Sequence, residues 1–416
     1  MIGPYIHLLR KRNFFLLWFS QIVSQFGDKL TQIALIGLVS RATDSSASLA
    51  YTISMTIIPV LLFSPVAGVY VDRWNKRTTM YMCDFLRGIV ILLIPLVFVR
   101  YRPLPLIYCV VFLTFSVGRF FIPAKMAFLP RLVDSKEIFL ANSLISVTAT
   151  IAAVLGVGLG GIIVDRFGVD SAFVIDAATF FISALSIFFI NAREKGRFSP
   201  EDIVDIAKSA AETIKSSFVN DFKEGLRYIA ASAQTRYAFM ISLFLFSCVG
   251  GVFPVFTKFI QGALGTLTKD IGFIGVSLGL GIFIGSLLYG RFAHIVSVKR
   301  VINYASLAGA LYLIVFSLLI AYYPSSKLAV LLSFVLGLIL SPIFVGVNSL
   351  LHKETSGALL GRIFGSLEFI SHLGLLISMF IFAHLADLFS PFTIMISLGI
   401  ISSFFALFFV LKYRSA

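Results

Sequence analysis

The hydrophobic residues of this chain fall into twelve long runs, most of them separated by short polar segments. A helix needs roughly 20 consecutive apolar residues to cross the hydrocarbon core of a bilayer, and every run meets that length. Lipid offers backbone groups no hydrogen-bond partner, so the pattern predicts an all-α membrane protein with twelve transmembrane helices. The predicted spans cover residues 14–40, 49–71, 78–99, 104–124, 140–164, 171–191, 237–260, 271–291, 301–323, 328–351, 364–386 and 391–411.

The longest polar segment divides six predicted spans from the other six. Residues 192–236 hold eight Lys or Arg residues and seven Asp or Glu residues. Apolar residues recur within this segment at helical spacing, which indicates amphipathic helices. We therefore expect an N-terminal six-helix bundle over residues 1–191, a cytoplasmic amphipathic linker over 192–236 and a C-terminal six-helix bundle over 237–416.

An internal repeat supports two related halves. Gly68 ends the second predicted span and Gly290 ends the eighth, 222 residues later. Asp165 and Asp387, which end the fifth and eleventh spans, are also 222 residues apart. The matched offset predicts two pseudo-symmetric bundles related by an axis along the membrane normal.

Composition and charge agree with this class of protein. Apolar residues make up 58% of the chain and charged residues 13%, about half the share of an ordinary soluble domain. The net charge of +14 is assigned to cytoplasmic loops, so no nucleic-acid partner is expected. With the N-terminus inside, cytoplasmic segments hold 24 Lys or Arg residues and outer loops hold 7, which predicts that both termini are cytoplasmic.

The first predicted span carries a polar face. Gln21, Gln25, Asp28 and Gln32 recur at spacings of four, three and four residues, which places them on one side of a helix. Four polar residues on one face predict the lining of a water-filled substrate cavity rather than contact with lipid. A charge inside a membrane span costs about 2.5–3.5 kcal/mol on insertion scales, so Asp28 is a candidate for proton coupling.

Other charged residues inside the spans are further candidates for proton coupling. Arg119 lies deep in the fourth span, where it could attract an anionic group or form a structural ion pair with Asp28. Glu368 and His372 are four residues apart in the eleventh span and share a face, which suits a proton relay or an interhelical hydrogen bond. Asp176, near the outer end of the sixth span, has no predicted role.

The loop after the second span carries a cluster of charge that we interpret as a cytoplasmic gate. An acid between two helices can act as a latch, because a buried charged contact is costly unless it is paired. An ordinary positively charged cytoplasmic loop is the alternative. The predicted gate comprises Gly68, Asp72, Arg73, Lys76 and Arg77, with Asp84 and Arg87 near the start of the third span as its support.

This loop closely resembles the signature loop of the major facilitator superfamily. The family pattern is glycine, three residues, Asp-Arg, two residues and two basic residues, and it fits Gly68, Asp72, Arg73, Lys76 and Arg77. Asn75 stands where the family usually has glycine. The resemblance implies a twelve-helix transporter in which spans 1, 4, 7 and 10 line a central cavity. It thereby adds cavity candidates from spans 7 and 10, namely Phe244, Ser247, Phe256, Ser341, Phe344 and Asn348.

Three further stretches resemble bacterial exporters. Residues 118–124 and 225–228 are similar to the branch that includes macrolide exporters and the enterobactin exporter. Gly156, Gly160 and Gly161 resemble the antiporter motif of drug exporters, although small residues also simply allow close helix packing. The resemblance implies residence in a bacterial cytoplasmic (inner) membrane and a role in efflux.

Together these features predict a secondary active transporter that works by alternating access. The expected activity is proton-coupled export of amphipathic, drug- or siderophore-like small molecules. The alternative is a lysophospholipid or other lipid transporter of the same superfamily. A transporter-like receptor that moves nothing is a third class, which the polar face of the first span disfavours.

No catalytic activity is predicted. The sequence contains no phosphate-binding Walker loop and no cluster with metal-ligand spacing, so we expect no enzyme, no cofactor and no metal site. The expected partners are a small amphipathic substrate, protons and membrane lipid, and the expected state is a monomer.

Overall fold

A computed structural model gives the structure of the protein. It describes residues 3–98, 103–191, 233–266, 268–292, 297–354 and 357–413, together with the single positions 220, 223 and 227. The predicted amphipathic linker lies almost wholly outside the described residues, so the domain boundaries proposed around it stay a prediction. No strand occurs within the described ranges.

Twelve helices of 20 to 32 residues form most of the described chain, which confirms the all-α fold class. They are α2 (Arg12–Ala42), α3 (Ser46–Arg73), α4 (Lys76–Phe98), α5 (Leu104–Phe128), α6 (Ile138–Phe167), α7 (Val169–Phe188), α9 (Ala233–Leu264), α10 (Lys269–Phe292), α11 (Val298–Tyr322), α12 (Ser326–Glu354), α13 (Gly357–Leu388) and α14 (Pro391–Lys412). A short helix α1 (Gly3–Arg10) precedes them, and a single 3₁₀ turn η1 (Leu129–Arg131) follows α5.

Eleven of these helices are long and apolar enough to cross a membrane. The exception is α2, whose polar face interrupts its hydrophobic run with Gln21, Gln25, Asp28, Lys29 and Gln32. Its 31 residues still provide about 46 Å of helix at 1.5 Å per residue, which exceeds the roughly 30 Å of the hydrocarbon core. The chain is therefore an integral, multi-pass membrane protein.

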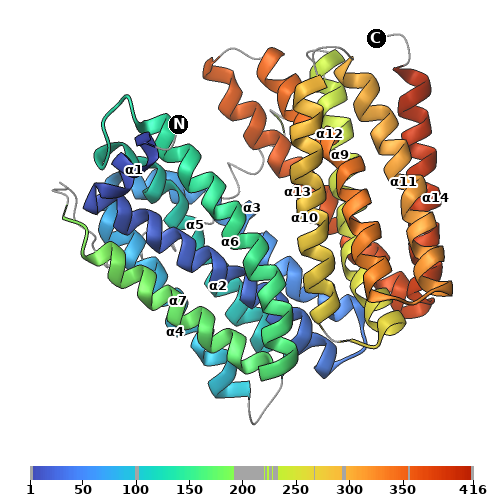
Figure 1. The fold of residues 1–416 in the computed structure, drawn as a ribbon, viewed down its shortest axis with the longest axis horizontal. Helices are drawn as coiled ribbons and strands as arrows, with labels where there is room; N and C mark the ends of the chain where they lie inside the picture. Colours follow the sequence, from blue (N-terminus) through green and yellow to red (C-terminus); the bar gives the residue numbers. More distant parts are fainter. Residues whose placement is uncertain are drawn as a thin grey trace. The chain divides into compact units, whose positions relative to one another are not determined.

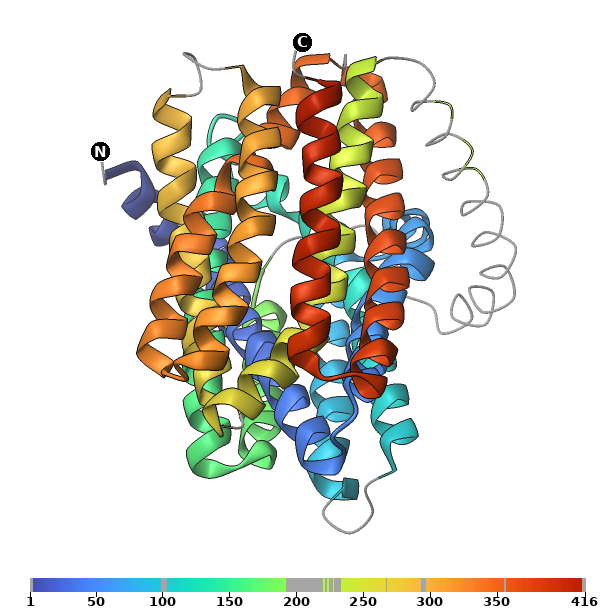
Figure 2. The same ribbon diagram turned by 90° about the vertical axis from the view of Figure 1, so that its right-hand side faces the viewer.

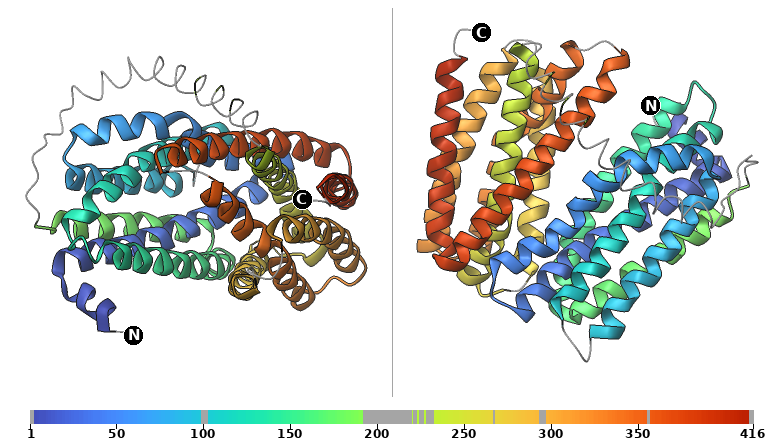
Figure 3. Two further views of the ribbon diagram at one scale, coloured as in Figure 1. Left: turned by 90° about the horizontal axis from the view of Figure 1, so that it is seen from above. Right: turned by 180° about the vertical axis from the view of Figure 1, so that it is seen from behind.

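The helices belong to two compact units. The first comprises Met1–Ala42 and Thr52–Phe218, and the second comprises Thr43–Tyr51 and Val219–Ala416. In the first unit α2 packs against α6 and α7, and α4 packs against α5 and α7 (Figure 1). In the second unit α9 lies beside α14 (Figure 2), and α9 also packs along α13 (Figure 3).

The start of α3 is part of the second unit. The Asp387 carboxylate, near the end of α13, accepts hydrogen bonds from the Ser46 backbone N–H at 2.5 Å and the Ala47 backbone N–H at 3.1 Å. The Ser45 hydroxyl donates to the same carboxylate at 2.5 Å. A carboxylate at this place satisfies N–H groups that have no partner within their own helix and meets the positive end of its dipole.

The 222-residue repeat extends to the helix boundaries. α4 begins at Lys76 and α11 at Val298, while α7 begins at Val169 and α14 at Pro391. α5 and α12 begin at residues 104 and 326, which are again 222 apart. The two halves therefore place equivalent helices at equivalent points of the chain.

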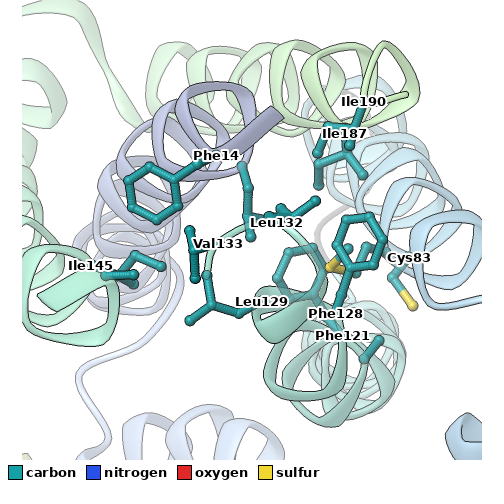
Figure 4. Close-up of a cluster of buried hydrophobic side chains, with 14 of the residues drawn as sticks. Phe14, Cys83, Phe121, Phe128, Leu129, Leu132, Val133, Ile145, Ile187 and Ile190 are labelled. Atoms are coloured by element: carbon teal, nitrogen blue, oxygen red, sulfur yellow. The ribbon is translucent and has the colours of Figure 1, made fainter. Parts of the chain in front are cut away.

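A hydrophobic core fixes one end of the first unit (Figure 4). Leu132 lies between Phe14 of α2 and Ile187 near the end of α7, and Phe128 of α5 belongs to the same core. The same core includes Trp74 from the loop between α3 and α4. This packing holds the predicted gate loop against the ends of α2, α5 and α7.

The second unit relies on close backbone contacts. A Cβ atom added to Gly250 of α9 would lie 2.2 Å from the Leu375 carbonyl oxygen of α13. One added to Gly281 of α10 would lie 2.2 Å from the Phe334 carbonyl oxygen of α12. These glycines let helix backbones approach in a way that any larger residue prevents.

Candidate functional site

A cluster of polar side chains, here called the buried polar network, joins three helices inside the first unit. One face of α7 contributes to the network. On this face Phe180 lies about one turn after Asp176, and Ser183 lies about two turns after it. The network consists of Asp28 and Thr31 on α2, Asp84 and Arg87 on α4, and Asp176, Thr179 and Ser183 on α7.

Arg87 is the cation at the centre of the network. Its Nη2 donates to Asp28 Oδ1 in an ion pair, and its Nη1 lies 3.6 Å from Asp84 Oδ1. The guanidinium carbon lies 4.1 Å from the centre of the Phe180 ring, which adds a cation–π contact. The Arg87 side chain is 9% exposed and that of Asp28 is 27% exposed, so Asp28 is the member of this pair that water can reach.

The two other carboxyls receive hydroxyl donors. Ser183 Oγ donates to Asp84 Oδ2 at 2.5 Å. Thr31 Oγ1 donates to Asp176 Oδ2, and Thr179 Oγ1 lies 3.2 Å from Asp176 Oδ1. Asp84 and Asp176 are both fully buried, so their environment offers these hydroxyls in place of water.

Gly27 makes room for Asp176 at the surface of α2. A Cβ atom added there would lie 2.0 Å from Thr179 Oγ1 and 2.2 Å from Asp176 Oδ1. Only glycine at this position lets the polar face of α7 contact α2.

The structure corrects the predicted partners of several residues. Arg87, rather than Arg119, is the cation paired with Asp28. Asp84 and Arg87 contact Asp28 and Ser183 within the bundle, and their support of the gate at Asp72 stays a prediction. The pairing depends on how α2 and α4 are rotated about their axes, which the periodicity of either helix does not fix.

Sequence reasoning gave Asp176 no role, although a usable signal was present. It is a carboxyl inside an apolar span, and such residues mark functional sites in membrane proteins. Ser183 follows it by seven residues on the same helix face, which marks that face as polar.

The predicted polar face of α2 makes hydrogen bonds of its own. Gln21 is buried, and its Oε1 accepts from Lys125 Nζ of α5 at 3.0 Å. Gln32 accepts from Lys29 Nζ, one turn away, at 3.0 Å. Gln25 is half-buried. Their role as a cavity lining stays a prediction.

A pocket of about 330 Å³ lies in the second unit between α9, α12 and α13. Glu368 and His372 line it together with the predicted cavity residue Phe344. His372 Nδ1 lies 2.8 Å from the Glu368 backbone carbonyl, and a carbonyl only accepts, so Nδ1 carries the proton.

Four other predicted cavity residues lie in helix–helix contacts of the second unit. Phe244 packs against Phe409 of α14, and Phe256 packs against Phe316 of α11. The Ser247 carbonyl accepts from Ser378 of α13 at 2.5 Å, and Ser341 is buried where α12 approaches Gly285 of α10. Their role as a cavity lining stays a prediction. The Asn348 side chain lies outside the described residues.

Basic residues of the predicted gate loop bind helix ends. Lys76 Nζ donates to the Asp72 and Trp74 carbonyls at 2.8 and 2.9 Å, and Arg77 Nη1 donates to the Ile190 carbonyl at 2.5 Å. Cations suit these positions because carbonyls at helix C-termini lack intrahelical partners and carry the negative end of the dipole. The side chains of Asp72 and Arg73 are exposed.

Gly68 and Asn75 of this loop have different surroundings. A Cβ atom added to Gly68 would meet no described atom within 4 Å. Asn75, at a usual glycine position, has a clear local use, because its Oδ1 accepts from the Thr78 N–H at 2.9 Å and caps the start of α4.

Eleven candidate membrane spans in the described part of the chain, together with α2 and the charged side chains buried in the first unit, are the features of a polytopic membrane transporter. Residues 4–340 match the family described as transmembrane secretion effectors, and the chain belongs to this family of the major facilitator superfamily. No group of three His, Cys, Asp or Glu residues in the described part of the chain is placed to hold a metal ion.

Relatives and solved structures agree with this assignment. The chain is 31% identical over 293 residues to the putative bacilysin exporter BacE of Bacillus subtilis (strain 168), covering 68% of this chain and 66% of that protein. It is 25% identical over 391 residues to the multi-drug resistance efflux pump PmrA of Streptococcus pneumoniae, covering 91% and 89%. The fold is similar to that of the nucleoside transporter NupG, with a TM-score of 0.74, 15% identity and coverage of 98% and 99%. The chain is thus a transporter of the major facilitator type, not an enzyme.

Proposed function

We propose that this transporter exports amphipathic small molecules in exchange for protons, by alternating access. The names of two relatives, a bacilysin exporter and a multidrug efflux pump, support the direction of transport and the class of cargo. The observation that carries the proton half of the proposal is the buried polar network.

Three carboxyls and one guanidinium belong to the buried polar network. Asp28 and Asp84 are paired with Arg87, and Asp176 lies one helical turn from Phe180, the ring on which that guanidinium rests. An ionised carboxyl without a cation is very costly in an apolar interior, so a network of this composition favours a neutral, protonated carboxyl. The partial exposure of Asp28 offers a route between that proton and water.

The pocket in the second unit supports the cargo half. Its walls combine aromatic and aliphatic side chains with one carboxylate and one imidazole, the composition expected of a site for amphipathic molecules. A volume of about 330 Å³ suits one end of a drug-sized cargo. Glu368 would attract a cationic group, and Phe246 and Phe344 would contact apolar parts.

We further propose that both termini are cytoplasmic and that Asp72 helps to close the cytoplasmic side. Cysteines introduced near residues 45 and 325 should react with impermeant thiol reagents in intact cells, and those near residues 3 and 415 should not. Asp72→Asn should favour inward-open molecules, seen as longer distances across the cytoplasmic ends of the halves. Unchanged distances would assign the loop to topology alone.

Transport by the purified protein in proteoliposomes, with and without a pH gradient, tests the proposal. The probes are ethidium, a dipeptide and a fluorescent lysophospholipid. We expect gradient-dependent accumulation of a soluble amphipathic probe. Movement of the lysophospholipid alone would instead support the alternative lipid transporter, and transport of a probe at a rate independent of the gradient would contradict proton coupling.

A further inference from the structure

We infer that Asp176 is the residue that holds the exchanged proton in this conformation, and that Arg87 expels the proton by turning from Asp28 to Asp176. The inference rests on the proposed proton exchange and names its site. It differs from the expectation that Asp28 carries the proton, because Asp28 already has a cationic partner in Arg87.

The distribution of partners separates the three carboxyls. Asp28 has a charged partner in Arg87, and Asp84 has both Arg87 and the Ser183 hydroxyl. Among the described residues, the Asp176 carboxyl makes hydrogen bonds with neutral hydroxyls, those of Thr31 and Thr179. Asp176 is therefore the carboxyl for which the neutral form costs least.

Burial strengthens this assignment. Asp176 is 0% exposed, whereas the Asp28 side chain is 27% exposed. A carboxylate fully removed from water is stable only with a cation or several donors. A protonated Asp176 needs neither, since it donates one hydrogen bond and accepts another from hydroxyl neighbours.

Arg87 is placed to change partners. Its guanidinium rests on Phe180, one helical turn from Asp176 on the same face of α7. Its Nε is buried and has no hydrogen-bond partner among the described residues, so the side chain has unused donor capacity. Gly118 of α5 leaves space beside the guanidinium, where an added Cβ atom would lie 3.4 Å from the guanidinium carbon.

The charged groups of the neighbouring helices limit the alternatives. Those on the elements packed against α7 near this site are Asp28 and Lys29 on α2, Asp84 and Arg87 on α4, and Asp165 and Arg166 at the end of α6. Lys29 donates to Gln32, and the two α6 residues are exposed. The charged groups near this site on α5, which packs against α4, are Arg119 and Lys125, and Lys125 donates to Gln21. Arg87 already forms an ion pair with Asp28, and we assign to it the exchange between Asp28 and Asp176.

The proton step balances without any other reactant. When Arg87 moves to Asp176, the O–H bond of Asp176 breaks and an O–H bond forms on Asp28, which has lost its cation. The Thr31 hydroxyl, one turn from Asp28 on α2, can relay the proton by accepting one and donating its own. Asp28 then passes the proton to water, and the charge of the network falls by one unit on release.

Infrared difference spectroscopy of the purified, cargo-free protein tests the inference directly. A protonated carboxylic acid has a carbonyl stretch that a carboxylate lacks, and ¹³C-labelled aspartate assigns that band to Asp rather than Glu. We expect an aspartic acid band at neutral pH that Asp176→Asn abolishes. Asp170→Asn, an exposed acid on the same helix, is the matched control and should keep it. A band unchanged in Asp176→Asn would overturn the inference.

A second measurement does not depend on that variant alone. Asp176→Asn replaces a neutral group by a neutral one and should leave the Tm close to wild type, whereas Asp28→Asn removes the partner of a buried guanidinium and should lower it. The reverse order would show that Asp28 holds the proton. Gly27→Ala displaces the Asp176 carboxyl without removing it, so it should shift the frequency of the band, and an unshifted band would contradict the assignment.

Transport separates this inference from the proposed function. Wild-type proteoliposomes that do not accumulate ethidium in response to a pH gradient would contradict proton exchange, whatever the infrared result. If wild type and Asp176→Asn accumulate ethidium equally, the result supports the proposed function and contradicts the inference that Asp176 holds the exchanged proton. We expect Asp176→Asn to retain ethidium exchange and to lose gradient-driven accumulation.

Discussion

The two halves of this transporter share helix positions but are held together differently. The 222-residue offset aligns Asp28 with Gly250, Arg87 with Gly309, and Asp176 with Leu398. The first half therefore has charges where the second half has small or apolar residues. Its buried polar network corresponds, in the second half, to close contacts made through glycine.

This difference indicates that the two halves respond differently to a conformational change. Ion pairs and hydroxyl contacts can exchange partners at modest cost, as long as each buried charge keeps a partner. Helix backbones in direct contact cannot slide without losing many dispersion contacts at once. We therefore expect proton-dependent rearrangement to begin in the first half, with the second half moving as a more rigid body.

Removing the central cation should have the largest effect on stability. Arg87→Leu leaves the buried Asp84 and the partly exposed Asp28 without their cation, and breaking a buried pair costs about 3–5 kcal/mol. Thermal unfolding in detergent measures the loss. Arg73→Leu, an exposed arginine at the end of α3, is the control and should have little effect. Equal Tm values for the two variants would contradict a structural role for the network.

A single methyl group should disturb the second half to a smaller degree. Gly250→Ala places a Cβ atom 2.2 Å from the Leu375 carbonyl, and overpacking of this kind costs about 1–3 kcal/mol. Gly262→Ala is a matched control on the same helix, because its Cβ atom would meet no described atom within 4 Å. The control should be neutral or slightly stabilising, since alanine favours helix over glycine. A loss of stability in Gly262→Ala as large as that in Gly250→Ala would contradict the role assigned to the close contact at Gly250.

The weakest effect is expected at the surface of the first half, where Lys11 Nζ lies 2.6 Å from Glu137 Oε2 and 2.8 Å from Asp134 Oδ2. Hydrogen bonding to Lys11 lowers the pKa of Glu137 to about 2 from its usual 4.5. A lowered pKa stabilises the fold above the unfolded value, so this contribution is complete above about pH 4.5 and is lost as the pH falls toward 2.

Proteolysis at the N-terminal helix α1 measures this contact. Glu137→Gln should speed cleavage modestly, and added salt should reduce the difference from wild type because it screens exposed charges. The difference should stay constant from about pH 8 to about pH 9.5. A difference that changes strongly across that interval would contradict the assigned cause.

The helix positions could be predicted from the sequence because the membrane imposes a length on every span. The run at 78–99 corresponds to α4 (Lys76–Phe98) and the run at 391–411 to α14 (Pro391–Lys412). Asp28 could also be singled out, since a charge in a span is costly wherever the helix lies.

The partners of these residues could not be predicted in the same way. Whether Arg87 or Arg119 meets Asp28 depends on the rotation of three helices, and apolar periodicity is weak in helices that are hydrophobic on most sides. For the same reason the contact of Phe244 with Phe409 of α14 could not be predicted from the sequence. The fit of the side chains at each helix–helix contact determines which residues meet. That fit depends on the sequences of both helices.

The central claim is that the coupling proton belongs to the first half, and one paired measurement tests it most directly. Accumulation of ethidium driven by a pH gradient is compared in inverted vesicles of wild type, Asp28→Asn and Glu368→Gln, one carboxyl from each half. We predict that Asp28→Asn abolishes accumulation, because Arg87 is freed to keep Asp176 ionised, while exchange of ethidium continues. Glu368→Gln should weaken accumulation far less. If Asp28→Asn still concentrates ethidium like wild type while Glu368→Gln does not, the proton site lies in the second half, at Glu368 and His372, and the claim is wrong.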